Sequence, residues 1–234
     1  MKVNPMESGG FDGFPREFQD FLLSLRHINT TERLEENKIR YKALITEPLT
    51  RLFYGLAPVA ASVDAALETK PSKCLSSMYS DMRFSRGAPL KEYMYVRFRE
   101  PSREKDIPGL YFDMGCEYYS YGIRIYNQTG PGMERIRKAA LAGGAAFARE
   151  LERAGGLGMA VFGAKYAKDR FAGVENLILR DFLNMRSFRV GKDCPVSDGV
   201  FRPELLEEIA EGFRGAKGLF GLIKDALRGG GPDV

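Results

Sequence analysis

The residues best suited to bind a ligand lie close together between Met78 and Arg99, in a turn and in the strand expected after it. Guanidinium groups form paired hydrogen bonds with phosphate or carboxylate, so several of them in one segment indicate an anion site. Charged and hydroxyl side chains surround the turn at Gly87-Ala88-Pro89, namely Asp81, Arg83, Ser85, Arg86 and Lys91.

Strict alternation follows this turn. Met94, Val96 and Phe98 would share one face of a strand, because successive side chains point to opposite sides. The other face would carry phenol and guanidinium groups, which suit anions and flat rings. The same pattern is typical of an ordinary solvent-facing sheet surface, so both interpretations stay open. The residues of this second face are Tyr93, Tyr95, Arg97 and Arg99.

Beyond the turn and this strand, other segments add candidates. Tyr119, Tyr121 and Arg124 belong to a Tyr-rich strand, and Arg186 opens a later extended segment. We predict a site for a small anionic ligand that carries phosphate or carboxylate. Its binding residues are predicted to be Arg83, Ser85, Arg86, Lys91, Tyr95, Arg97, Tyr119, Tyr121, Arg124 and Arg186.

Asp81 is the best candidate for a catalytic acid or base, should the protein be an enzyme. Neighbouring guanidinium groups favour the ionised carboxylate, which makes it a weak base at neutral pH. Binding is therefore favoured over catalysis.

Histidine and cysteine limit the remaining chemistry. A Ser-His-Asp or Cys-His mechanism would have to use His27, the one histidine, which falls at the end of the first expected helix, where the helix dipole suffices to explain it. Cys74, Cys116 and Cys194 are far apart and form no metal-binding pair. We predict no metal site and no cofactor.

The composition is that of a globular protein, with 44% hydrophobic and 28% charged residues in a chain of 234. The formal net charge is only +4, and the segment from Arg83 to Lys105 alone holds seven basic and three acidic residues. No signal peptide and no apolar run long enough to span a bilayer is seen, so we predict a cytoplasmic protein without a membrane partner.

RNA or single-stranded nucleic acid is the alternative partner, although the modest net charge counts against it. In that case aromatic rings would stack on bases and guanidinium groups would follow phosphates. The residues for this role are Tyr93, Tyr95, Tyr119, Arg97, Arg99 and Arg103.

Periodicity predicts the elements that position these residues. We expect an α+β fold in a single domain over residues 11–228, with flexible ends at 1–10 and 229–234. An antiparallel meander of about four strands is packed by N- and C-terminal helices. The strands are expected at Cys74–Tyr79, Tyr93–Arg99, Leu110–Cys116 and Glu117–Tyr126, with a further extended segment at Arg186–Val190.

Helices are expected from Phe14 to Ile28, from Leu34 onward with a kink at Pro48, and at Glu134–Arg153, Val174–Asn184 and about Pro203–Arg228. Asn29 and Glu32 would cap the second helix. The apolar stripe of the last helix could alternatively serve a homodimer, and the oligomeric state stays open.

Several motifs together resemble the family called domain of unknown function 2461, a group of uncharacterised bacterial proteins. They are Phe11-x-Gly-Phe14, Tyr79-x-Asp81-x-Arg83-Phe84-Ser85 with Pro89-x-Lys91, and Arg186-Ser187-Phe188. The chain departs from the family pattern at Leu34, Ser80 and Leu90, where tryptophan, arginine and tyrosine are usual. The resemblance implies an α+β fold in one domain, and it implies no activity.

Overall fold

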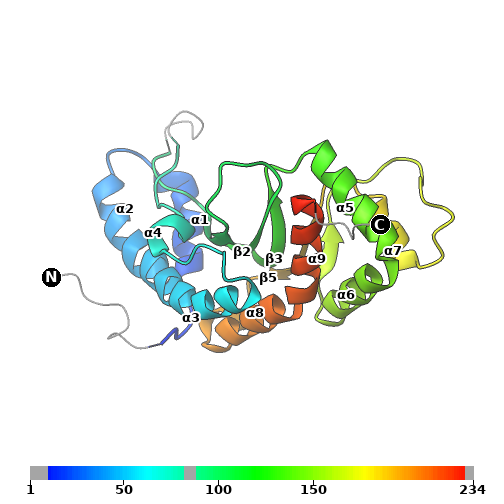
Figure 1. Ribbon diagram of the computed structural model, residues 1–234. Helices are drawn as coiled ribbons and strands as arrows, with labels where there is room; N and C mark the ends of the chain where they lie inside the picture. Colours follow the sequence, from blue (N-terminus) through cyan, green and yellow to red (C-terminus); the bar gives the residue numbers. More distant parts are fainter. Residues whose placement is uncertain (1–9, 82–87, 230–234) are drawn as a thin grey trace.

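A five-stranded antiparallel sheet forms the centre of the computed structural model, which describes residues 10–81 and 88–229 (Figure 1). The strand order is β1-β2-β3-β5-β4, so β1 to β3 form the predicted meander. The α+β fold is confirmed, with five strands where about four were expected. The strands are β1 Met94–Arg99, β2 Ile107–Met114, β3 Tyr118–Tyr126, β4 Ala160–Phe162 and β5 Arg189–Pro195.

Three of the predicted ligand residues, Arg83, Ser85 and Arg86, lie outside the described residues. So do nearly all of the residues at the two ends for which we predicted flexibility.

The helices lie at both ends of the sheet and across it (Figure 1). One group consists of α1 Glu17–Ile28, α2 Leu34–Tyr41, α3 Glu47–Val63 and α4 Pro71–Cys74. At the other end are α5 Gly130–Ala142, α6 Gly144–Gly156 and α7 Leu177–Leu183. Between them run α8 Glu204–Gly215 and α9 Lys217–Arg228. Short π- and 3₁₀-helical segments, η2 Lys42–Thr46 and η3 Asp198–Phe201, complete the order.

Aromatic packing joins one face of the sheet to the helices, and we call it the core face. Phe98 of β1 stacks on Phe53 of α3 at 5.6 Å between ring centroids, and its edge meets Phe213 of α8 at 6.2 Å. Phe112 of β2 stacks on Phe14, just before α1, at 6.5 Å. Because these rings are fully or almost fully buried, the core face fixes the positions of helices from both ends of the chain.

The opposite face of the sheet, which we call the polar face, consists of three rows of residues paired across the strands. The first row is Tyr95–Asp113–Ser120–Asp193. The middle row is Arg97–Tyr111–Gly122–Gly191. The third row is Arg99–Gly109–Arg124–Arg189.

Two local predictions were wrong. Cys74–Tyr79 is not a strand, since α4 ends at Cys74 and only single bridges follow, Leu75 with Val96 and Tyr79 with Leu90. Asn29 does not cap the second helix. Its buried amide instead accepts a hydrogen bond from the Leu90 amide at 3.0 Å and donates one to the Leu90 carbonyl at 2.8 Å, which binds the end of α1 to the turn before β1.

Helix boundaries differ from the prediction where the backbone leaves helical geometry. The helix expected to kink at Pro48 is interrupted just before it, because π-helical η2 separates α2 from α3 and Pro48 lies in the first turn of α3. The expected helix Glu134–Arg153 is two helices separated at Gly143, and the expected last helix is divided at Ala216. The stripe of this last pair is buried inside the chain from Leu205 to Ile223, so it is not free for a second copy. No helix in the described parts of the chain has the length and apolar character needed to cross a bilayer.

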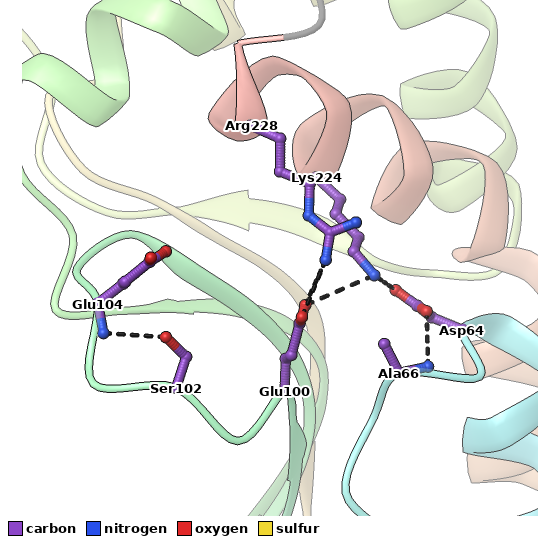
Figure 2. A network of polar contacts seen from close by, with 7 residues as sticks. All are labelled: Asp64, Ala66, Glu100, Ser102, Glu104, Lys224 and Arg228. Atoms are coloured by element: carbon purple, nitrogen blue, oxygen red, sulfur yellow. Dashed lines mark hydrogen bonds and ion pairs between the residues drawn. The ribbon is translucent and has the colours of Figure 1, made fainter.

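A charged network holds α9 against the end of β1 (Figure 2). Lys224 pairs with Asp64, the residue that ends α3, and lies 3.7 Å from Glu100. Arg228 also pairs with Glu100, at 2.7 Å. The Lys224 side chain is only 12% exposed and Asp64 only 17%, so this pair is shielded from solvent. Burial opposes ionisation of Asp64, but hydrogen bonds from Lys224 and the Ala66 amide outweigh it and lower its pKa.

We predict that Lys224→Met lowers the free energy of unfolding by about 2–4 kcal/mol, because it leaves a shielded carboxylate without its cation. Since the pKa of folded Asp64 lies below its ordinary value of 3.8, this loss is full above that pH and shrinks as pH falls through the folded value. Urea unfolding across a pH series measures it. Lys138→Met, an exposed change on α5, is the control, and equal effects of the two substitutions would contradict the prediction.

Candidate functional site

Arg97 is the centre of the candidate site. Its guanidinium carbon lies 3.6 Å from the centroid of the Tyr95 ring and 5.8 Å from that of Tyr126. The Nε atom is buried without a hydrogen-bond partner, and no carboxylate among the described residues pairs with this side chain. The Lys91 ammonium stands 5.4 Å from the Tyr95 centroid, and burial together with the nearby Arg97 lowers its pKa. Two cations therefore share one aromatic ring.

Tyr111 supports the rest of the polar face. It is fully buried and its side chain extends toward Gly122 and Gly191, where a Cβ on Gly191 would come within 2.5 Å of the phenol oxygen. The hydroxyl is 2.9 Å from Ser120 Oγ and accepts a hydrogen bond from Arg189 at 2.9 Å. Gly191 in the middle row thus makes room for a phenol that positions an arginine from the third row.

Arg124 crosses the same ring. Its guanidinium carbon lies 4.4 Å from the Tyr111 centroid, and Nη2 is 2.9 Å from Asp113 Oδ2. The other carboxylate oxygen, Oδ1, is buried and has no hydrogen-bond partner. Burial raises the pKa of Asp113 although Arg124 and Arg97 favour its ionised form. Asp113 is therefore a partly satisfied acceptor at the centre of the face.

Asp193 behaves in the opposite way. Arg189 Nη2 is 2.5 Å from its Oδ2. Burial opposes ionisation here too, but the hydrogen bonds from Arg189 and Ser120 outweigh it, and the pKa of Asp193 is lowered. Asp113 and Asp193, which lie in the same row, therefore have pKa values shifted in opposite directions.

Two cavities meet at Arg97. The central cavity, of about 330 Å³, lies over the first row of the polar face. Its principal lining residues are Tyr93, Arg97, Asp113, Tyr118, Ser120, Arg124, Arg189 and Asp193.

The edge cavity, of about 360 Å³, lies where β1 ends. It is lined by four cationic side chains and one carboxylate, so its charge is strongly positive. The lining residues are Glu68, Lys73, Arg97, Arg99, Pro101, Ser102 and Arg103.

Comparison with known proteins gives the family. The family model described as "Conserved hypothetical protein (DUF2461)" matches residues 17–221. The chain belongs to this family. No curated protein matches the chain. The DUF2461 model spans every strand of the sheet and both cavities, so the polar face lies wholly within the family region.

The structure gathers four of the predicted binding residues on this DUF2461 sheet. Tyr95, Arg97 and Arg124 lie on the polar face, and Lys91 reaches Tyr95. Asp81, the catalytic candidate, is exposed and lines neither cavity. Arg186 is exposed after α7, where its backbone amide donates to the Ala164 carbonyl at 2.6 Å, and it also lines neither cavity.

Tyr119 and Tyr121 lie on the core face, apart from Arg97 and Arg124. Both hydroxyls donate to Glu208 of α8, and Lys192 joins the same carboxylate at 3.0 Å. Burial and Glu208 raise the pKa of Tyr121. These phenols attach α8 to the sheet and do not contribute to the two cavities.

Sequence reasoning missed Asp113, Arg189, Asp193 and Lys73. Asp113 is the only charged residue of β2, a signal that was available in the sequence. Arg189 and Asp193 are four positions apart in one strand and so share a face. Lys73 carried no such signal, since it comes from α4 and meets the site only through the fold. Within the described residues no three side chains of His, Cys, Asp or Glu gather as a metal site would require.

We predict opposite pH effects for Asp113→Asn and Asp193→Asn. Folded Asp113 has a pKa above its ordinary value of 3.8, so its ionisation costs folding free energy as pH rises, and the asparagine variant gains stability relative to the parent. Folded Asp193 has a lowered pKa, so its variant loses relative stability as pH rises. Urea unfolding between about pH 3 and about pH 7 measures both trends. Trends of the same sign would contradict the assigned environments.

Proposed function

We propose that this protein binds a small anionic ligand, bearing phosphate or carboxylate, on the polar face of its sheet in the cytoplasm. One observation carries the proposal: the four cations of the edge cavity converge there, and none has a carboxylate ion-pair partner among the described residues. They are Lys73, Arg97, Arg99 and Arg103.

Stability does not account for this arrangement. Like charges gathered around one cavity repel each other, and solvent-exposed cations add little to folding even when they are paired. Arg124 and Arg189 show the contrast, because each has an aspartate at 2.9 Å or less. The one carboxylate of the edge cavity, Glu68, accepts hydrogen bonds from the backbone amides of Thr69 and Lys70. An anion supplied by a ligand would balance the charge that the fold leaves uncompensated.

Arg97 adds the aromatic element of the site. Its stacking on Tyr95 holds the guanidinium plane, which reduces the ordering cost of binding a planar anionic group. The proposed site therefore centres on the sheet, whereas most of the turn for which the sequence predicted it lies outside the described residues. The cytoplasmic location is supported by the free thiols of all three cysteines.

A second candidate function, binding of single-stranded nucleic acid, is favoured by exposed rings beside the cations. Tyr93 is 51% exposed and Tyr118 59%, and both line the central cavity. Bases stack on such rings, and each phosphate contacted steepens the dependence of affinity on salt.

The test is a pair of substitutions, Arg97→Gln with Arg99→Gln, measured by thermal shift and calorimetry against inorganic phosphate, phosphorylated sugars, small carboxylates and a short RNA. We expect at least one small anion to stabilise the parent, and the double variant to lose about tenfold or more in affinity, since charge-assisted hydrogen bonds contribute about 1.5–3 kcal/mol each. Arg202→Gln, an exposed change before α8, is the matched control.

Two results would overturn the small-anion proposal. One is a parent protein whose melting temperature no small anion raises. The other is tight RNA binding that weakens steeply between two salt concentrations while small anions have no effect, which would favour the second function.

A further inference from the structure

We infer that the anionic ligand is a nucleoside monophosphate, with its phosphate in the edge cavity and its base in the central cavity. This inference rests on the proposed function and names the ligand class of the same site. Its basis is the chemical difference between two cavities that share Arg97.

The spacing of the rows fits such a ligand. Residues two apart in a strand are separated by about 7 Å, so the row of Arg99 and the row of Asp113 lie about 13 Å apart, with Arg97 between them. A mononucleotide in extended form places its phosphate and its base at opposite ends of a comparable length. Each cavity alone lies near the lower end of the ~300–1,000 Å³ usual for ligand sites, and the two together provide the room.

The edge cavity matches a phosphate. Lys73 comes from α4, Arg99 from β1 and Arg103 from the connection to β2, so donors approach from three directions. Three negatively charged or hydrogen-bonding oxygens of a phosphate can each be bound by a different cation.

The central cavity has a different character. Its Arg124 and Arg189 are neutralised by Asp113 and Asp193, so only Arg97 contributes a positive charge without a protein partner. What remains for a ligand is the acceptor capacity of these two carboxylates, whose side chains are 22% exposed for Asp113 and 39% exposed for Asp193. A second anionic group would gain little from arginines that are already paired, whereas a neutral ring with N–H donors would find carboxylate acceptors.

Flat surfaces at the cavity complete the match. The rings of Tyr93 and Tyr95 stack with 6.3 Å between their centroids. The exposed ring of Tyr118 lines the central cavity from β3. Aromatic rings and carboxylate acceptors are the groups that proteins use to stack a base and to bind its amino edge.

Calorimetry with inorganic phosphate, ribose 5-phosphate, the four common ribonucleoside monophosphates and the free nucleosides tests the inference. We expect at least one nucleotide to bind about tenfold or more tightly than ribose 5-phosphate and than its own nucleoside. Asp113→Asn should reduce the affinity for that nucleotide toward the level of ribose 5-phosphate while leaving the affinity for ribose 5-phosphate unchanged. Arg103→Gln should weaken both ligands, and Arg202→Gln neither.

Tyr118→Ala is a second test variant that we expect to fold like the parent, because this side chain is mostly exposed. It should lower nucleotide affinity at least about fivefold through lost stacking and leave ribose 5-phosphate binding unchanged.

Equal affinity of the parent for ribose 5-phosphate and for every nucleotide would overturn the inference while the proposed function stands. So would folded Asp113→Asn and Tyr118→Ala variants that bind nucleotides like the parent. Failure of every phosphate-bearing ligand, inorganic phosphate included, would instead overturn the proposed function itself.

Discussion

The alternation of side chains across an antiparallel sheet is the constraint on which this structure depends. In β1 it sends Phe98 between Phe53 and Phe213 on one face and Arg97 onto Tyr95 on the other. Because the aromatic packing is buried and specific, a shift of the register by one residue would expose those rings and bury the guanidinium groups. The energetic demand of the core thus fixes the rows of the polar face. The polar side chains of that face are therefore positioned by aromatic packing on the core face, to which they do not contribute.

A glycine in the middle row, Gly191, leaves room for side chains of the polar face to meet. Gly122 and Gly191 follow Tyr111 in this row, and the space that the missing side chain of Gly191 leaves is filled by the phenol. Arg124 and Arg189 then reach across Tyr111 from the third row to the aspartates of the first. Charges that the register places four residues apart along the strands are thereby brought into contact. This pairing separates the polar face into a nearly balanced centre and a positive edge.

The sequence was sufficient for the parts of the site that depend on one strand, and insufficient for those that depend on register. Alternation alone placed Tyr95 and Arg97 together. The same rule places Tyr119 and Tyr121 on the opposite face from Arg124, since their positions differ from 124 by the odd numbers five and three. Grouping them was therefore an error that the sequence alone could have prevented. Lys73 is different: it comes just before Cys74, where a strand was predicted to begin, and only the folded chain shows that it belongs to the helical turn α4 beside the end of β1.

The edge cavity is positive because acidic and basic side chains at the end of β1 point in different directions. Glu100 follows Arg99 in sequence, yet it pairs with Arg228 and lies near Lys224 of α9, while Arg99 faces the edge cavity (Figure 2). Period-two geometry directs neighbours of opposite charge to opposite sides, and α9 then takes up the acid. Glu68, the one acid that lines the edge cavity, accepts hydrogen bonds from two backbone amides. Glu68 and Glu100 are therefore engaged elsewhere in the fold and form no ion pair with Arg99 or Arg103, which leaves the edge cavity its positive charge.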